Sequence, residues 1–225
     1  MTLGDYLSKT RFFLRDPQGI AYTTQNLTDC INQARSDIVS DTWVTRALTN
    51  TIFTNQNQTL YNFQTVLSAV QGAGYQAQQI IGIANIAVYW SATLKPTLDY
   101  MEWGDLNAWF GSFTGFTFIP SIWGMYDLQS FYLYPIPNGS YQLEIDAIYL
   151  PNYLVNTTDT DLLPPTIADF ILVPYKAASI AKQNQQDVAM STYWENKYAV
   201  ELEKRMSQFP VFRIPSRYGN DPRRP

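Results

Sequence analysis

The spacing of apolar residues changes twice along the chain, and this change constrains the fold more than any single motif. Four stretches carry apolar residues at helical spacing, namely 2–14, 24–40, 164–181 and 187–206. Between 51 and 153, aromatic and β-branched residues alternate with polar ones, and Gly, Pro and Asn interrupt them, as in short antiparallel strands. The pattern predicts an α+β fold. N- and C-terminal helices form a helical core from 1–50 and 160–207, and an antiparallel β-rich subdomain, 51–159, is inserted between them.

The helix ends carry their own signals. Thr2, with Asp5 three residues later, predicts the cap of the first helix, and Asp187 predicts the start of the last one. Pro174 falls inside the third helical stretch, which starts around Pro164 to Asp169. A proline there removes a backbone hydrogen bond, so we expect a kink. Along the last helix, apolar residues recur every four positions and form an apolar stripe, which consists of Met190, Trp194, Tyr198, Leu202 and Met206.

The middle of the chain predicts specific strands. Ser130–Tyr134 and Tyr141–Tyr149 are separated by Pro, Asn and Gly residues, which predicts that the two strands pair as a hairpin. A further strand is expected over 86–94. Residues 102–110 have the spacing of a short helix, with Trp103, Leu106 and Phe110 on one side.

The C-terminal segment 208–225 combines prolines with arginines. Four prolines prevent a helix, so we expect an extended arm. Residues 204–225 hold six basic residues and one acidic one, whereas the preceding 203 residues have a net charge of −9. Apolar anchors mixed with Arg are typical of interfaces, although a solvated, disordered terminus is the alternative. The candidate docking residues are Phe209, Phe212, Arg213, Ile214, Arg217, Tyr218, Arg223 and Arg224.

The chain contains no histidine. This removes Ser-His-Asp and Cys-His nucleophilic sites and every His-ligated metal centre. Cys30, the one cysteine, falls on the apolar side of a predicted helix, so we expect a buried, reduced thiol. Gly72 and Gly74 stand in QGAGYQ without the Lys-Ser/Thr of a phosphate-binding loop, which predicts a turn. We therefore expect no catalytic site, no cofactor and no metal, and the chain is not expected to be an enzyme.

The chain also has no obvious membrane or export segment. The longest apolar run, 80–90, is too short to span a bilayer, and the N-terminus has no signal-peptide core. We therefore expect a soluble protein that is made in the cytoplasm and does not bind a membrane.

One group of acidic residues leaves a second function open. Asp99, Glu102 and Asp105 stand beside Trp103 and Trp109, and a pair of carboxylates next to sugar-stacking aromatic rings is the equipment of a glycosidase or a carbohydrate-binding protein. The competing structural interpretation is that the acidic residues stabilise a helix N-terminus and the tryptophans are buried.

Three stretches in order carry a resemblance to a known family. The opening TLGDYLSKTRFFLRDP with LTDCINQARSDI, the central LDYMEWGDLNAWF with FYLYPIPNGSYQLEIDAIYLP, and the closing LPPTIADFILVPYKAASIAKQNQQDVAMSTYWENKYAVELEKR cover about residues 2–207. In this order and spacing the chain resembles the head-to-tail adaptor (connector) proteins of tailed bacteriophages, of the podovirus portal-adaptor type.

The resemblance implies a structural role in the virion. It implies a homo-oligomeric ring, commonly of twelve copies, that joins the portal protein to a downstream tail or nozzle protein. It also implies that genomic DNA passes through the ring without specific binding and that the C-terminal arm reaches onto the portal. An acidic body suits such a channel, because it does not hold phosphates. A carbohydrate-binding or carbohydrate-active virion protein, or another neck or tail ring component, remains the alternative.

Overall fold

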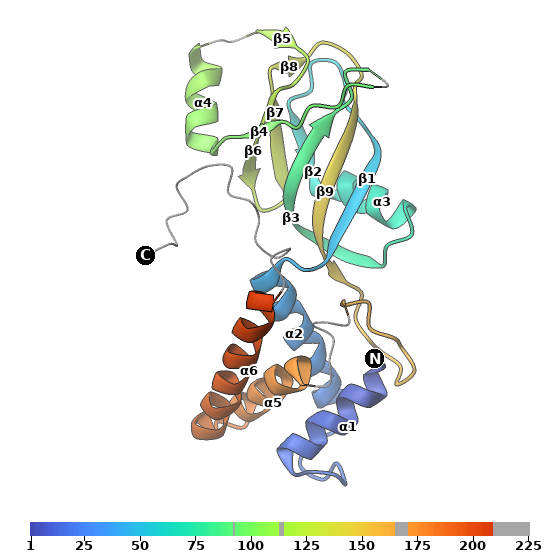
Figure 1. The fold of residues 1–225 in the computed structure, drawn as a ribbon, viewed down its shortest axis with the longest axis vertical. Coiled ribbons are helices and arrows are strands. Elements are labelled where there is room, and N and C mark those ends of the chain that lie inside the picture. Colours follow the sequence, from blue (N-terminus) through green and yellow to red (C-terminus); the bar gives the residue numbers. More distant parts are fainter. Residues whose placement is uncertain (92, 113–114, 165–170, 209–225) are drawn as a thin grey trace. The chain divides into compact units, whose positions relative to one another are not determined.

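The structure is a computed structural model and describes residues 1–91, 93–112, 115–164 and 171–208 (Figure 1). It consists of two compact units. The helical unit comprises Met1–Val44 and the described residues from Tyr153 onward, and the strand unit comprises Thr45–Asn152. Among the described residues, the helical unit contains four helices, and the strand unit contains two shorter helices and mainly antiparallel sheets with two short parallel pairs. The predicted α+β fold is confirmed.

The described helices of the helical unit are α1 (Leu3–Leu14), α2 (Thr24–Thr42), α5 (Leu172–Asn184) and α6 (Val188–Gln208). Helix α1 begins with the predicted capping box. The Thr2 hydroxyl accepts a hydrogen bond from the Asp5 backbone at 3.2 Å, and the Thr2 backbone donates to the Asp5 carboxylate at 2.9 Å. These bonds satisfy backbone groups that a helix end otherwise leaves without an intrahelical partner.

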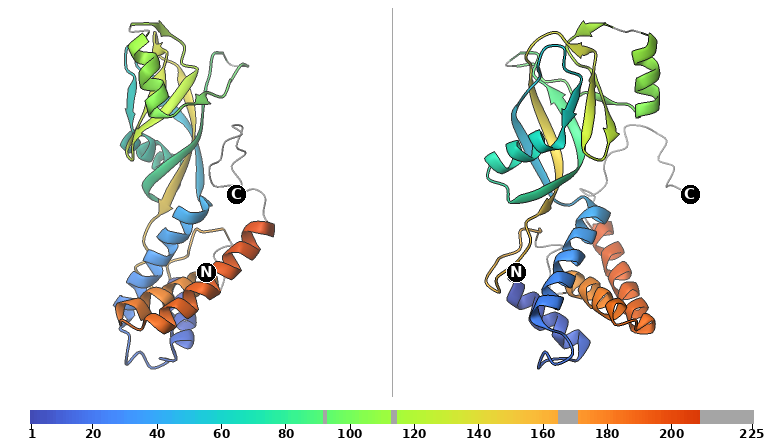
Figure 2. Two further views of the ribbon diagram at one scale, coloured as in Figure 1. Left: turned by 90° about the vertical axis from the view of Figure 1, so that its left-hand side faces the viewer. Right: turned by 180° about the vertical axis from the view of Figure 1, so that it is seen from behind.

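Helix α5 is the packing centre of the helical unit and contacts α1, α2 and α6 (Figure 2). Its buried side includes Ala177, Ala178, Ser179 and Ala181, small side chains that let neighbouring helices approach closely. Since α5 begins at Leu172, the buried Pro174 lies in its first turn. There the missing N–H has no intrahelical acceptor to lose, so the predicted kink is wrong. The expected helix start around Thr166 and Asp169 lies outside the described residues.

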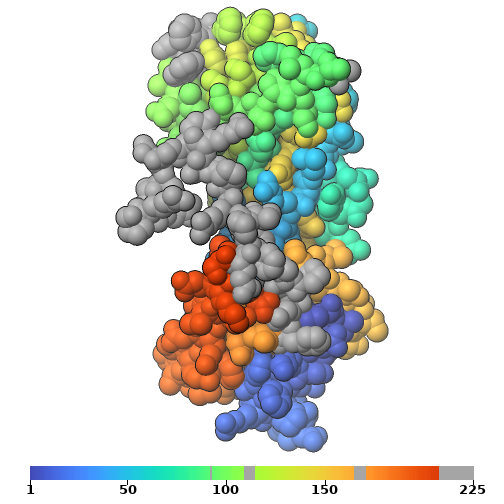
Figure 3. Space-filling model, in the orientation of Figure 1, coloured from blue at the N-terminus to red at the C-terminus, as the bar shows by residue number. Residues whose placement is uncertain are grey.

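Helix α6 starts as predicted, because the Asp187 carboxylate accepts from the Met190 backbone at 3.2 Å. Its expected apolar stripe is only partly buried. Tyr198 is 3% exposed, whereas Trp194, Leu202 and Met206 are half-buried and Met190 is exposed. Helix α6 therefore leaves much of its length at the molecular surface, where it is coloured red-orange in the space-filling view (Figure 3).

The strands of the strand unit form three described sheets. In order, the first contains β1 (Arg46–Phe53), β9 (Gln142–Pro151) and β3 (Ala77–Val88). The second contains β2 (Leu60–Asn62), β7 (Ser130–Tyr134), β6 (Ile122–Asp127) and β4 (Asp99–Tyr100). The third pairs β5 (Thr117–Phe118) with β8 (Ile136–Pro137). The helices of this unit are α3 (Phe63–Gly72) and α4 (Trp103–Ser112), and α4 confirms the short helix predicted over 102–110.

The predicted hairpin is wrong, although both of its strands exist. Strand β7 pairs with β6 and β2, whereas β9 pairs with β1 and β3, so each strand lies between two other partners in its own sheet. The connecting segment 135–141 passes from one sheet to the other. A strand with both edges occupied by neighbours has no free edge for a hairpin partner.

Other boundaries in the strand unit also differ from expectation. Strand β3 covers 77–88 instead of 86–94, and β1 includes residues 46–50, which the sequence places in the helical core. Helix α3 was not predicted. Helix α3 ends at Gly72, and the turn that follows it contains Ala73 and Gly74, so the turn predicted from Gly72 and Gly74 is confirmed at Gly74 only.

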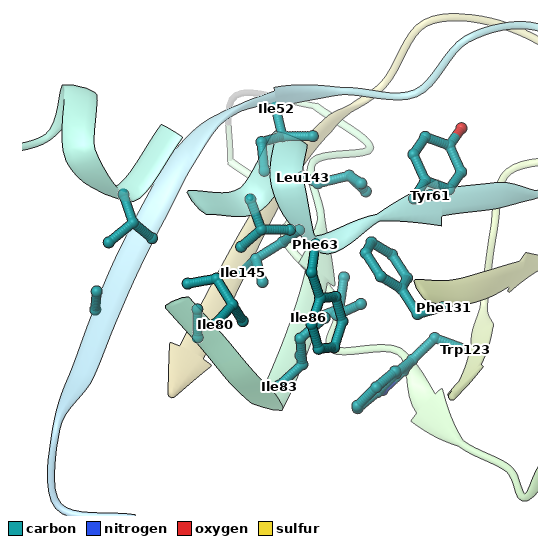
Figure 4. Packing of buried hydrophobic residues seen from close by; sticks show 14 of the residues in the cluster. Ile52, Tyr61, Phe63, Ile80, Ile83, Ile86, Trp123, Phe131, Leu143 and Ile145 are labelled. Carbon is teal, nitrogen blue, oxygen red and sulfur yellow. The ribbon is translucent and has the colours of Figure 1, made fainter. Parts of the chain in front are cut away.

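The core of the strand unit lies between the two larger sheets and α3 (Figure 4). Ile86, Leu143 and Ile145 of the first sheet are fully buried, and so is Phe131 of the second. The ring of Phe131 stacks on that of Tyr61, with centroids 5.5 Å apart. In β1 and β9 the buried residues largely alternate along the strand, so one face of the three-stranded sheet points into this core.

Candidate interaction surfaces

A buried charge network in the helical unit joins the N-terminal helices α1 and α2 to the segment that follows the strand unit. Asp161 accepts from Arg35 at 2.8 Å (Nη2) and 3.1 Å (Nε) and from the Tyr6 hydroxyl at 2.7 Å. The Arg35 and Asp161 side chains are 2% and 0% exposed. Asn32 adds a second tie, because its side-chain amide donates to the Leu154 carbonyl and accepts from the Leu154 backbone, both at 2.9 Å. These bonds hold the returning segment 153–163 against α1 and α2.

Sequence reasoning missed this network. Arg35 lies four residues after Ile31 and three before Ile38, so it falls beside the apolar stripe of its helix. A charged residue at such a position indicates a buried partner of opposite charge, since an unpaired buried charge is very costly. The stripe could therefore have identified Arg35, but the sequence gives no means of choosing Asp161 among the acidic residues.

A second charge cluster lies where α2, α5 and α6 meet. Lys176 contacts Glu195 at 2.7 Å and Asp37 at 3.9 Å, and its ammonium group lies 4.9 Å from the ring centre of Tyr198. The Tyr198 hydroxyl donates to Asp41 at 3.1 Å. Partial burial, together with the charges of Asp41 and Glu195, raises the pKa of Asp37, while Lys176 acts in the opposite sense. Burial also raises the pKa of Tyr198, and the charge of Asp41 adds to the effect.

A cluster of aromatic rings, which we call the aromatic seam, joins α6 to α1 and α5. Phe13 lies 4.9 Å from Tyr175 and 5.2 Å from Trp194, measured between ring centroids. Next to it the surface is apolar, since Phe12 is 70% exposed and Tyr193 is 47% exposed. Exposed aromatic side chains beside a packed seam are typical of protein contact surfaces.

Helix α4 covers the outer face of the four-stranded sheet. Trp123 of β6 points into the core, whereas Tyr132 of β7 lies opposite Gly124 on the other face. Trp103 stacks on Tyr132 with ring centroids 4.6 Å apart and meets the ring of Tyr126 edge to face at 4.9 Å. We name this ring cluster, which consists of Trp103, Tyr126 and Tyr132, the α4 face.

Gly124 makes the close approach of α4 possible. A Cβ atom at this position would lie 2.5 Å from the Met101 carbonyl oxygen and 3.0 Å from Cδ2 of Leu106. Leu106 is fully buried, so it has little space to move away. Glycine at 124 therefore fixes where the first turn of α4 packs on β6.

The three predicted carboxylates lie in β4, just before α4 and in its first turn. Asp99, Glu102 and Asp105 are all exposed, whereas a glycosidase general acid depends on an environment shielded from water. Trp103 is accounted for by its packing between two tyrosines, and the side chain of Trp109 lies outside the described residues. The exposed acidic residues and the packed Trp103 describe a contact surface better than a catalytic cleft.

The predicted docking arm lies outside the described residues, so the structure gives no place for its candidate contacts. These are Phe209, Phe212, Arg213, Ile214, Arg217, Tyr218, Arg223 and Arg224. Helix α6 ends at Gln208, immediately before them. The arm residues therefore follow directly from a surface helix.

Cys30 is buried, at 4% exposure, as predicted. Burial raises the pKa of its thiol, and Asn184 lies 3.7 Å from the sulfur. Among the described residues, no group of acidic residues and cysteine is arranged to hold a metal ion. In the same parts of the chain, no helix is both long and apolar enough to cross a membrane.

Comparison with known proteins gives the family. The model of the SU10 adaptor protein family matches residues 1–220, which include every described helix and strand. No curated protein matches the chain significantly. The match covers far more than half of the sequence and agrees with the resemblance carried by the three sequence stretches. The chain therefore belongs to the SU10 adaptor protein family, a family of phage adaptor proteins.

Proposed function

We propose that this chain is a head-to-tail adaptor that joins the portal of a tailed phage to its tail. The observation that carries the proposal is the family match over residues 1–220. The proposed partners are the portal protein on one side and a downstream tail or nozzle protein on the other. The proposed location is the virion neck, with assembly in the cytoplasm of the bacterial host, and the proposed role is structural and without catalysis.

The proposed assembly is a ring, with twelve copies as the expected number. Its support is the exposed apolar surface of the helical unit. On α6, Val188, Tyr193 and Val200 are 72%, 47% and 67% exposed, in addition to the exposed Phe12 of α1. Contacts between neighbouring copies would remove these side chains from water, and apolar burial is the main driving force of association.

The proposed channel for DNA is supported by charge. The helical unit, counted over 1–44 and 153–208, contains nine basic and twelve acidic residues, and the strand unit contains two and six. Each unit is therefore acidic, with net charges of −3 and −4. Phosphates are repelled by such surfaces, so genomic DNA would pass without being bound.

The basic arm is proposed to dock on the portal. Apolar anchors at Phe212, Ile214 and Tyr218 would bind in pockets, and Arg213 and Arg217 would steer the approach through their charge. Truncation after Gln208 removes the arm and leaves α6 complete. The truncated chain should lose most of its binding to portal particles, and unchanged binding would contradict this part of the proposal.

A charge-matched control separates docking from general attraction. Arg213→Gln with Arg217→Gln removes two charges within the arm, whereas Lys204→Gln with Lys197→Gln removes two exposed charges from α6. The arm variant should weaken portal binding more than the helix variant. Equal losses would mean that only the net charge matters.

The main experiment mixes the purified chain with portal particles and examines them by negative-stain electron microscopy. Rings stacked on the portal are expected. Binding to glycans or sugar release, abolished by Glu102→Gln, would instead support the carbohydrate function.

A further inference from the structure

The aromatic seam reaches the surface of the helical unit at two of its rings. The exposed Phe12 lies 5.9 Å from Phe13, and the exposed Tyr193 lies 4.9 Å from Trp194, measured between ring centroids. The ammonium group of Lys9 lies 5.5 Å and 5.3 Å from the ring centres of Phe12 and Phe13. In the described parts of the chain, Lys9 forms no ion pair with a carboxylate. We name Lys9, Phe12 and Tyr193 the seam surface, an apolar surface with a positive charge that is typical of a protein contact.

A second surface of the same unit, at the junction of α2 and α6, carries excess negative charge. Lys176 contacts Asp37 at 3.9 Å and Glu195 at 2.7 Å, and the charges of Asp41 and Glu195 both act on Asp37. Three carboxylates thus share one ammonium group. The side chains of Asp37 and Glu195 are 38% and 43% exposed, and Asp41 is exposed, so a further cation can approach them from solvent. We name Asp37, Asp41 and Glu195 the acidic junction.

The two surfaces lie on nearly opposite sides of α6. Tyr193 and Glu195 are two positions apart in this helix, which corresponds to a rotation of roughly 200°. Glu195 contacts Lys176, which also contacts Asp37 of α2, whereas Tyr193 extends the seam that reaches α1 through Trp194. Both surfaces belong to the helical unit. One copy therefore presents a positive, apolar surface and a negative surface in different directions.

A closed ring needs such an arrangement, because one side of each copy must bind a different side of the next copy. We propose that the seam surface of one copy binds the acidic junction of the neighbouring copy. Lys9 would pair with carboxylates of the neighbour, and the contact would remove the rings of Phe12 and Tyr193 from water. The inference rests on the proposed ring and goes beyond it, since it names the two surfaces that meet.

The test counts the chains bound to portal particles by native mass measurement over a range of chain concentrations. Lys9→Glu places a negative charge opposite the acidic junction. It should raise the concentration that half-fills the ring at least about tenfold, since every contact loses an attraction and gains a repulsion. The control Lys204→Glu makes the same change eleven positions after Tyr193, about 16 Å along the helix axis. It should stay within about twofold of the parent chain.

Charge exchange tests whether the two surfaces meet each other. Asp41→Lys should weaken assembly as Lys9→Glu does, and a chain with both substitutions should return to within about threefold of the parent chain, because the surfaces attract again. The matched control, Lys9→Glu with Asp29→Lys, should recover nothing. Asp41→Lys also removes the acceptor of the Tyr198 hydroxyl, so urea unfolding first checks that each variant is folded. Lys9→Glu breaks no ion pair of the described residues, so it tests the contact even where Asp41→Lys lowers stability.

Two results would overturn the inference. Lys9→Glu would fill the ring at the same concentration as the parent chain, or the chain with both substitutions would assemble no better than either single variant. The second result would assign the seam surface to the portal instead of a second copy. Both leave the adaptor function intact, because the parent chain still assembles on the portal. A parent chain that binds no portal would refute the adaptor function itself, and the ring contact with it.

Discussion

The substitution Asp161→Asn tests the buried network that joins α1 and α2 to segment 153–163. Asp161 accepts from Tyr6, twice from Arg35 and from the Leu163 backbone at 3.1 Å. The asparagine keeps the shape of the side chain but replaces one acceptor oxygen with an NH₂ group that faces donors. It also leaves the Arg35 guanidinium, at 2% exposure, without its counter-charge. Removing one partner of a buried pair costs about 3–5 kcal/mol, a large part of the stability of a domain.

A matched control exists in the strand unit. Arg46 and Asp146 form a similar Arg–Asp pair, but their side chains are 39% and 21% exposed. Asp146→Asn should therefore cost only about 0–1 kcal/mol. The two variants make the same chemical change in opposite environments, so their difference measures the effect of burial.

The assay is urea unfolding followed by circular dichroism at a helix-sensitive wavelength. Separate transitions for the two units would be fitted separately. Asp161→Asn should shift the helical transition strongly to lower urea, and Arg35→Met combined with Asp161→Asn should recover part of the loss, because no unpaired charge is left buried. A loss below about 1 kcal/mol, no larger than that of Asp146→Asn, would refute the account of the network.

Three further predictions concern single positions. Gly124→Ala should destabilise the strand unit by about 1–3 kcal/mol in thermal or urea unfolding. The control Gly104→Ala places its Cβ where no atom lies within 4 Å and should be neutral or slightly stabilising. Equal effects of the two variants would contradict the close packing of α4 at Gly124. Folding raises the pKa of Asp37 above its ordinary 3.8. Ionisation of this carboxyl therefore lowers the free energy of unfolding at pH values above the raised pKa, and it has no such effect below pH 3.8, where the carboxyl is protonated in both states. Asp37→Asn should therefore be more stable than the parent chain at neutral pH, with a difference that disappears below pH 3.8, and a difference independent of pH would count against it. The buried Cys30 should react with a thiol reagent at least about tenfold more slowly in the native chain than in denaturant, and equal rates would show that the thiol is accessible.

The features that the sequence predicts well depend on local interactions. The capping box of Thr2 and Asp5 and the start of α6 at Asp187 involve residues three positions apart, so the pattern contains all participants. The change from helical to alternating periodicity likewise identifies the α+β fold, because the period follows from the geometry of each element.

The features that the sequence does not predict depend on distant partners. Ser130–Tyr134 and Tyr141–Tyr149 look like a hairpin. The second of them, in β9, instead pairs with distant segments, Ile86 with Ile145 among the pairs, and β7 pairs with the distant β2 at Tyr61 and Phe131 as well as with its neighbour β6. Pairing of this kind is set by the shared core rather than by the turn. The partner of Arg35 is 126 residues away for the same reason.

The candidate interaction surfaces were only partly foreseeable. Trp103 of LDYMEWGDL is visible in the sequence, but its contacts with Tyr126 and Tyr132 require the pairing of β6 with β7 and the close approach at Gly124. The portal-docking role of the arm remains a prediction from its composition and from the resemblance.

The central claim is that the chain assembles on a portal as an adaptor. Native mass measurement of the portal complex tests it most directly, because the mass added to the portal gives the number of 25.8 kDa chains bound. The account predicts a single species with one ring of chains, twelve being the expected number. A chain that stays monomeric and adds no mass to the portal at any concentration would contradict it.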